Sequence, residues 1–243
     1  MKSIIVVPCY NEAKRLQKEA FVSYVQQNAD IDFLFVNDGS SDNTLQVLEA
    51  LCATDPHLHL LNLQPNGGKA EAVRKGMLHA SQNFSAEVVG FWDADLATPL
   101  NEIKDFVAWL EKGYDAVLGL RLMRLGAEVK RRKLRHYLGR TFATCASMIL
   151  HLPVYDTQCG AKLFRSSVVS PLCTTPFLTR WLFDVELLAR YRNAYGIEAA
   201  CNKVYEYPLF HWIDVEGSQL KSRDFVKAPM ELMKIRKQYN RRK

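Results

Sequence analysis

The sequence has no long hydrophobic run and no paired cysteine motif. Its longest uncharged stretch near the middle, residues 141–155, is too short to cross a bilayer and includes a histidine and a proline. Only three residues precede the first apolar run, so we expect no signal peptide and no segment that crosses a membrane. The six cysteines are scattered without a Cys-x-x-Cys pair, which argues against a zinc knuckle or a small disulfide framework and favours a reducing, cytoplasmic compartment.

The sequence also lacks the P-loop pattern and any recognised nucleic-acid-binding motif. It does contain a large apolar fraction, 48% of 243 residues, which is enough for one large α/β domain with a well-filled core. Because no linker, repeat or low-complexity segment interrupts the chain, we expect a single domain over residues 1–243.

The net charge of +6 is unevenly distributed along the chain. Residues 121–140 and residues 221–243 each carry a net charge of +7, so the rest of the chain carries −8. Such concentrated basic charge predicts an anionic partner: a nucleic acid, an anionic membrane surface or a phosphate-bearing substrate. A nucleic-acid-binding module is the weakest of these readings, because the basic residues are not regularly interleaved with aromatic side chains.

The first half of the chain alternates short apolar runs with longer amphipathic segments, which is the pattern of a mostly parallel sheet with crossover helices. We expect strands near residues 3–8, 32–37, 57–62, 87–93 and 114–119. We expect helices near residues 11–28, 42–54, 69–82 and 100–112.

The second half begins with a basic segment and continues with further helices and short strands. We expect helices near residues 134–150, 167–173, 183–194 and 224–239, and strands near residues 161–164 and 199–208. The last of these helices is basic and amphipathic, which favours contact with a membrane interface. Its apolar stripe consists of Phe225, Val226, Met230, Met233 and Ile235.

The most informative pattern is Asp93-Ala94-Asp95, directly after the apolar run 88–92. Two carboxylates at the carboxyl end of a buried parallel strand lie where open α/β sheets bind ligands, and they can share one hard divalent cation. An acidic helix-starting loop would show the same pattern, since Thr98-Pro99 fits an ordinary helix start.

Other polar motifs follow the earlier strands. Pro8-Cys9-Tyr10-Asn11-Glu12 comes after the first strand and residues 37–44 come after the second, while Asn66-Gly67-Gly68-Lys69 opens the third helix. Asp38 could accept a hydrogen bond from a nucleobase or a ribose hydroxyl, although Asp-Gly-Ser is also a common turn. At Lys69 a helix amino terminus and an ammonium group converge, an arrangement that suits a phosphate.

These motifs, in this order after successive strands, resemble the family 2 glycosyltransferases with the GT-A fold. Residues 156–164, 180–188 and 216–218 resemble the polyprenyl-phosphate hexosyltransferases, most closely the dolichyl-phosphate β-glucosyltransferases, with the dolichol-phosphate mannose synthases more distant. The resemblance covers residues 4 to about 221. The chain departs from the family pattern at Asn37, Ala70 and Ala161, and Ala97 replaces the Gln typical of the mannose synthases, which favours the glucosyl branch.

The resemblance implies one GT-A domain, a Rossmann-like, mostly parallel sheet flanked by helices. Residues 1–120 would form the nucleotide-sugar-binding half, residues 121–221 the acceptor-binding half and residues 222–243 the basic amphipathic helix. The nucleotide sugar would be bound by Pro8, Tyr10, Glu12, Asp38, Lys69, Arg74 and Asp93. Asp93 and Asp95 would hold Mg²⁺ or Mn²⁺, and Arg121 and Arg132 would bind the phosphate of the acceptor.

The activity implied by the resemblance is a metal-dependent, inverting transfer of a hexose to a polyprenyl phosphate, dolichyl or undecaprenyl, at the cytoplasmic face of a membrane. UDP-glucose is the expected donor and GDP-mannose the alternative. A phosphate monoester has a second pKa of about 6, so its oxygen needs no catalytic base. If the acceptor were a saccharide hydroxyl, Asp156 or Asp184 would be the candidate base. Otherwise we expect Asp184 to pair with Arg180 or cap a helix, and Asp156 to orient Arg121 or Arg132.

Overall fold

The computed structural model describes residues 1–130, 133–214 and 222–240. Arg132 of the predicted acceptor site and residues 216–218 of the third family-like segment lie outside these ranges. The side chains of residues 133–136 and 222–226 are likewise not described.

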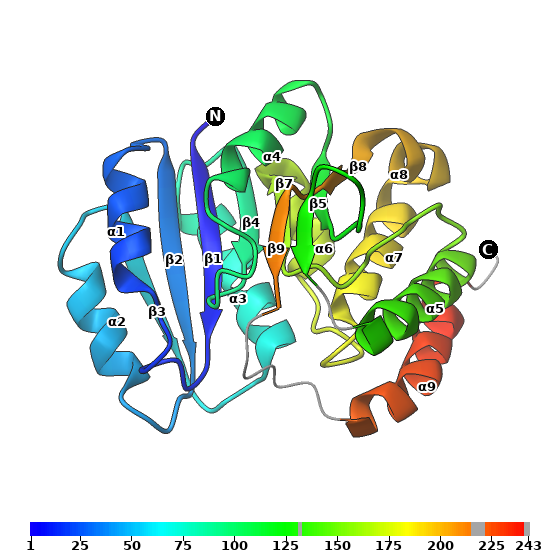
Figure 1. Ribbon diagram of the computed structural model, residues 1–243, viewed down its shortest axis with the longest axis horizontal. Coiled ribbons are helices and arrows are strands. Elements are labelled where there is room, and N and C mark those ends of the chain that lie inside the picture. The colour runs from blue at the N-terminus through cyan, green and yellow to red at the C-terminus, as the bar shows by residue number, and fades with distance from the viewer. Residues whose placement is uncertain (131–132, 215–221, 241–243) are drawn as a thin grey trace.

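A seven-stranded sheet with the strand order β3-β2-β1-β4-β7-β5-β8 forms the centre of the molecule (Figure 1). Strand β7 runs antiparallel to β4 and β5, while the other neighbouring strands are parallel. Parallel strands covered on both faces are apolar along their length, which is why they can be recognised in the sequence. The strands are β1 (Ser3–Cys9), β2 (Ile31–Asp38), β3 (Leu58–Leu63), β4 (Val88–Trp92), β5 (Ala116–Leu120), β7 (Ala161–Arg165) and β8 (Val204–Pro208).

Helices cover both faces of this sheet. One face packs on α1 (Lys18–Gln26), α2 (Thr44–Cys52) and α4 (Glu102–Glu111). The other face packs on α3 (Lys69–Asn83), α5 (Lys133–Leu150), α6 (Ser166–Cys173), α7 (Phe183–Tyr195), α8 (Ile197–Lys203) and α9 (Ser222–Tyr239). The two apolar cores on either side hold the carboxyl ends of the strands in fixed positions, and the expected α/β architecture is confirmed.

Two of the expected elements differ from the structure, and one small sheet was not expected. The helix expected over residues 11–28 begins only at Lys18, because residues 11–13 are bonded to the loop after β2 and to the start of α2, with Glu12 N donating to Thr44 Oγ1 at 2.8 Å. The strand expected over residues 199–208 is α8 followed by β8. A small second sheet pairs β6 (Glu128–Lys130) with β9 (His211–Ile213), and strands of three residues are too short to show alternation in the sequence.

The last helix, α9, lies beside α5 at one edge of the molecule (Figure 1). Ile235 is buried in the core, whereas Met230 and Met233 are 57% and 52% exposed. The single stripe predicted for this helix is therefore divided between the core and the surface. Among the helices that the structure describes, none combines the length and apolarity needed to span a bilayer.

Candidate functional site

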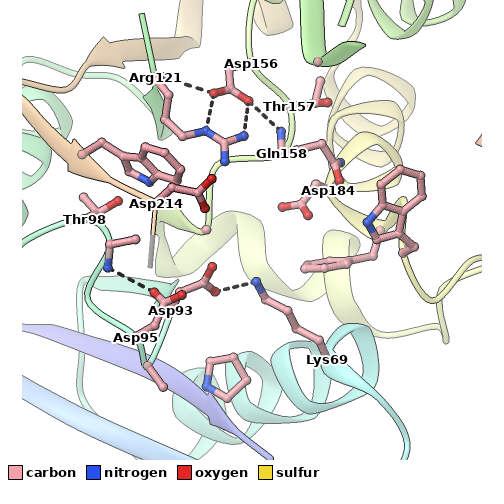
Figure 2. Close-up of a pocket in the computed structure, with 18 of the residues that line it drawn as sticks. Lys69, Asp93, Asp95, Thr98, Arg121, Asp156, Thr157, Gln158, Asp184 and Asp214 are labelled. Atoms are coloured by element: carbon pink, nitrogen blue, oxygen red, sulfur yellow. Dashed lines mark hydrogen bonds and ion pairs between the residues drawn. The ribbon is translucent and has the colours of Figure 1, made fainter. Parts of the chain in front are cut away.

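A cavity of about 470 Å³ opens where β1, β2, β4 and β5 end (Figure 2). Ligands bind at this edge of open parallel sheets. Most of the site residues predicted from the sequence contribute to its wall. They are Pro8, Tyr10, Glu12, Asp38, Lys69, Asp93, Asp95, Arg121, Asp156 and Asp184.

Arg74 is not part of this wall. Its guanidinium is paired with Glu71, at 2.6 Å, and Nη1 donates to the carbonyl oxygen of Cys173 at 2.9 Å. These contacts attach α3 to the end of α6 and leave the side chain 8% exposed. The prediction that Arg74 contacts the pyrophosphate is therefore wrong, since its five-residue spacing from Lys69 places it about 140° around α3 from the lysine.

The acidic pair lies on the loop after β4. Asp93 Oδ1 is 2.5 Å from Lys69 Nζ, at the start of α3. The absence of a side chain at Gly160 makes room for Asp93, because a Cβ there would lie 1.9 Å from Asp93 Oδ2. Burial, together with the charge of Asp93, raises the pKa of Asp95. The two carboxylates thus concentrate negative charge, and a bound cation would reduce the repulsion between them.

The composition of the wall suits a hard divalent cation bound together with a phosphate ligand. Within the described ranges, no three metal-ligating side chains converge, so Asp93 and Asp95 would supply part of a coordination shell and diphosphate oxygens or water the rest. In the described part of the wall, carboxylates outnumber cationic side chains, so a divalent cation would offset this excess when anionic substrates bind. The carboxylates are Glu12, Asp38, Asp93, Asp95, Asp156, Asp184 and Asp214, and the cations are Arg15, Lys69, Arg121, Arg140 and Arg180.

A carboxylate binds the loop that leads into α3. Asp38 accepts hydrogen bonds from the backbone N–H groups of Gly67 and Gly68, at 2.8 and 2.7 Å, and from Asn66 Nδ2 at 2.9 Å. The structure therefore corrects the expectation that these amides are available to a phosphate. Asp38 still faces the cavity, but most of its hydrogen-bonding capacity fixes the loop before α3.

Two cationic side chains lie at this end of the cavity. Burial opposes the charge of Lys69, but Asp93 and Asp184 outweigh it and raise the pKa of the ammonium group. Arg180 lies over Gly68, where a Cβ would be 2.6 Å from its Nη2. Arg180 was predicted only as a partner for Asp184, and its place in the wall depends on how the loop before α7 folds over α3.

Arg121 lies at the opposite side of the cavity, directly after β5. Its Nε and Nη2 bond to the two oxygens of Asp156, at 2.7 and 2.8 Å. Burial disfavours the charged form of Arg121, but the negative charge of Asp156 has the larger effect and raises the pKa of Arg121. The remaining terminal nitrogen points into the cavity (Figure 2). Asp156 therefore orients Arg121, as one of the sequence-based alternatives predicted.

Asp184 is held by a lysine and not by Arg180. Lys162 Nζ, on β7, lies 2.6 Å from Asp184 Oδ1 and also donates to the carbonyl oxygen of Cys159. Burial raises the pKa of Asp184 while Lys162 opposes that effect. The predicted pairing with Arg180 is wrong, because the side chain of Asp184 turns toward the sheet.

The sequence of this chain matches a known protein family. Residues 4–172 match the family described as Glycosyl transferase family 2. The chain is 32% identical to a dolichyl-phosphate beta-glucosyltransferase of Trichomonas vaginalis, with 95% of this chain and 69% of the relative aligned. It is 27% identical to the dolichyl-phosphate beta-glucosyltransferase of Saccharomyces cerevisiae, with 97% and 74% aligned.

Two solved structures share the fold of this chain. One is glucosyl-3-phosphoglycerate synthase from Mycobacterium tuberculosis in complex with Mn²⁺, UDP-glucose and phosphoglyceric acid, with a TM-score of 0.68, 15% identity and coverage of 97% of this chain and 80% of that one. The other is a mannosyltransferase from Pyrobaculum calidifontis in complex with GDP-Man and Mn²⁺, with a TM-score of 0.65, 18% identity and coverage of 100% and 65%.

Proposed function

Because the chain belongs to glycosyl transferase family 2, as an enzyme with the GT-A fold, we propose that it transfers glucose from UDP-glucose to a polyprenyl phosphate such as dolichyl phosphate. The names of relatives that align with nearly the whole chain support the sugar and the acceptor. The complexes of the two solved structures support a nucleotide sugar and a divalent cation as ligands.

The observation that carries the proposal is the separation of two charged groups across one cavity. The pair formed by Lys69 and Asp93, with Asp95 beside it, lies at one side, and Arg121 with Asp156 lies at the other (Figure 2). Such an arrangement can hold a diphosphate and a second phosphate at the same time. The space between them would receive the hexose.

On the donor side, Pro8, Tyr10 and Glu12 would contact the nucleoside, and Lys69 and Arg180 would face the diphosphate. A Mg²⁺ or Mn²⁺ ion held by Asp93 and Asp95 would neutralise the departing nucleoside diphosphate when bound. Lys69 would keep Asp93 oriented toward that charge and would itself bind a phosphate oxygen. Both functions need Lys69 to remain protonated, and its surroundings favour that state.

On the acceptor side, Arg121 would bind the lipid phosphate, because a guanidinium group presents several N–H donors to phosphate oxygens. A phosphate oxygen then attacks the anomeric carbon from the face opposite the diphosphate. This single displacement on an α-linked donor inverts the anomeric centre and forms a β-linked product.

Neither of the two candidate bases from the sequence is arranged to accept a proton from a hydroxyl acceptor. Asp156 and Asp184, the two candidates from the sequence, are each held in an ion pair, with Arg121 and Lys162. Transfer to a saccharide hydroxyl is therefore the less favoured alternative, since a base must accept the proton of the attacking group.

A transfer assay tests donor and acceptor together. UDP-glucose, UDP-galactose, UDP-N-acetylglucosamine and GDP-mannose are each paired with dolichyl phosphate, undecaprenyl phosphate and a free oligosaccharide. We expect UDP-glucose with a polyprenyl phosphate to give the highest turnover. Preferential use of GDP-mannose would support the alternative donor, and turnover of the oligosaccharide alone would overturn the phosphate acceptor.

We also propose that the surface of α5 and α9 contacts an anionic membrane, from which a polyprenyl phosphate would be taken. Its exposed apolar side chains are Tyr137, Leu138, Met148, Met230 and Met233. Lys234 and Lys237 of α9 border these methionines. Apolar side chains flanked by lysines suit a bilayer interface that contains anionic lipids. Co-sedimentation with phosphatidylserine vesicles should be lost in the variant Met230→Ser/Met233→Ser, and unchanged binding would contradict the proposal.

A further inference from the structure

We infer that a second arginine, Arg140 of α5, binds the acceptor phosphate together with Arg121, and that Glu206 of β8 positions both arginines through the segment Tyr155-Asp156. This inference rests on the proposed phosphate acceptor. It adds three residues, Arg140, Tyr155 and Glu206, whose roles neither the sequence motifs nor the proposed mechanism includes.

Arg140 lies in the wall of the cavity and is held there by one residue. Its Nη1 donates to the carbonyl oxygen of Tyr155 at 2.9 Å, and its Cζ lies 3.2 Å from the centroid of the Tyr155 ring. These two contacts fix the plane of the guanidinium group without neutralising its charge.

The other hydrogen-bond donors of Arg140 remain available to a ligand. In the part of the chain that the structure describes, Nε and Nη2 have no hydrogen-bond partner, and Arg140 forms no ion pair with a carboxylate. Lys69 and Arg121 of the same wall are each paired with an aspartate. A guanidinium group with free, oriented donors in a cavity is suited to a phosphate monoester.

The two arginines are held by consecutive residues. Asp156 binds Arg121 through both of its oxygens, and Tyr155 binds Arg140 through its ring and its carbonyl oxygen. Because neighbouring Cα atoms are about 3.8 Å apart, one short segment sets the position of both guanidinium groups. A change in the backbone of this segment would therefore move both arginines together.

Glu206 anchors that segment from the neighbouring strand. Its oxygens accept hydrogen bonds from the backbone N–H of Tyr155, at 2.8 Å, and of Asp156, at 2.7 Å. Strand β8 is paired in parallel with β5, with Glu206 opposite Leu118, three residues before Arg121. Burial of the carboxylate raises the pKa of Glu206, while the backbone N–H groups oppose this effect. The sheet itself thus sets the distance between the anchored segment and Arg121.

Steady-state kinetics with the full chain can separate this role from a general structural one. Arg140→Ala should raise the KM for the polyprenyl phosphate by about tenfold or more, as expected for the loss of charge-assisted hydrogen bonds, with the KM for UDP-glucose unchanged. Tyr155→Ala should reproduce this effect, whereas Tyr155→Phe retains the ring and should behave like the wild type. Lys104→Ala removes a positive charge from the exposed face of α4, outside the cavity, and serves as the control.

The positioning role of Glu206 is tested by comparing two substitutions of this residue. Glu206→Ala should raise the acceptor KM, and Glu206→Gln, which keeps one oxygen acceptor, should give a smaller increase. The affinity for UDP, measured by calorimetry, should stay the same in both variants. An unchanged acceptor KM in Arg140→Ala, or an equal rise in the donor and acceptor KM values, would overturn the inference.

Direct binding of farnesyl phosphate in the presence of UDP distinguishes this inference from the proposed function. If the wild type binds or glucosylates the prenyl phosphate and Arg140→Ala does so equally well, the role of Arg140 fails while the proposed function stands. If the wild type neither binds nor glucosylates it, both fail. Loss of binding in Arg140→Ala alone, with unchanged thermal unfolding, supports the inference.

Discussion

Replacing Lys162 by methionine should destabilise the protein strongly, because it leaves a buried carboxylate without its cation. Lys162 is 0% exposed and Asp184 is 6% exposed, and the ion pair between them measures 2.6 Å. Methionine keeps most of the apolar stem, so the principal loss is the charge. Removing one partner of a buried ion pair costs about 3–5 kcal/mol. Since Asp184 also faces the cavity and the charge of Lys69, we expect the lower part of this range.

The loss can be measured by urea and thermal unfolding. For a domain of this size each kcal/mol lowers the Tm by about 2–4 °C, so Lys162→Met should lower it by about 6–12 °C. The double variant Lys162→Met/Asp184→Leu replaces the pair by apolar side chains and should recover most of the stability. Stability of the single variant within about 0.5 kcal/mol of the wild type, or additive losses in the double variant, would refute the reasoning.

Three further substitutions test the side of the cavity that we propose binds the donor. Asp95→Asn should abolish stimulation of transfer by Mn²⁺ without lowering the Tm, because burial already disfavours the charged form of Asp95; full activity of this variant in a chelator would contradict a metal role. Arg180→Ala should lower the affinity for UDP, measured by calorimetry, by about tenfold and leave the affinity for uridine unchanged, since only the diphosphate would face this arginine. An equal loss of affinity for uridine would show that Arg180 does not act on the diphosphate. Gly160→Ala should displace the Asp93 carboxylate and reduce UDP affinity in the presence of Mn²⁺, and unchanged affinity would show that the orientation of Asp93 is not needed.

The first half of the fold, residues 1–120, could be predicted well from the sequence because its signals are local. Each of the first strands is a short apolar run, and a polar motif follows it at the edge where parallel strands end. It could therefore be predicted, without knowing the strand order, that the motifs around Asp38, Lys69 and Asp93 lie at one edge of the sheet. Arg74 shows the limit of reading motifs alone, because its place about 140° around α3 from Lys69 turns it toward the neighbouring α6.

The second half of the chain was harder to predict because its residues act through partners that are distant in sequence. Glu206 fell within an expected strand, yet its contact with Tyr155 and Asp156 exists only because β8 lies next to β5 in one register. Lys162 likewise reaches Asp184 only because β7 is inserted antiparallel between β4 and β5. Periodicity assigns a residue to a face of a strand but not to a neighbouring strand. Residues that face the ligand at strand ends can thus be found from motifs, whereas those that hold them in place depend on the strand order of the sheet.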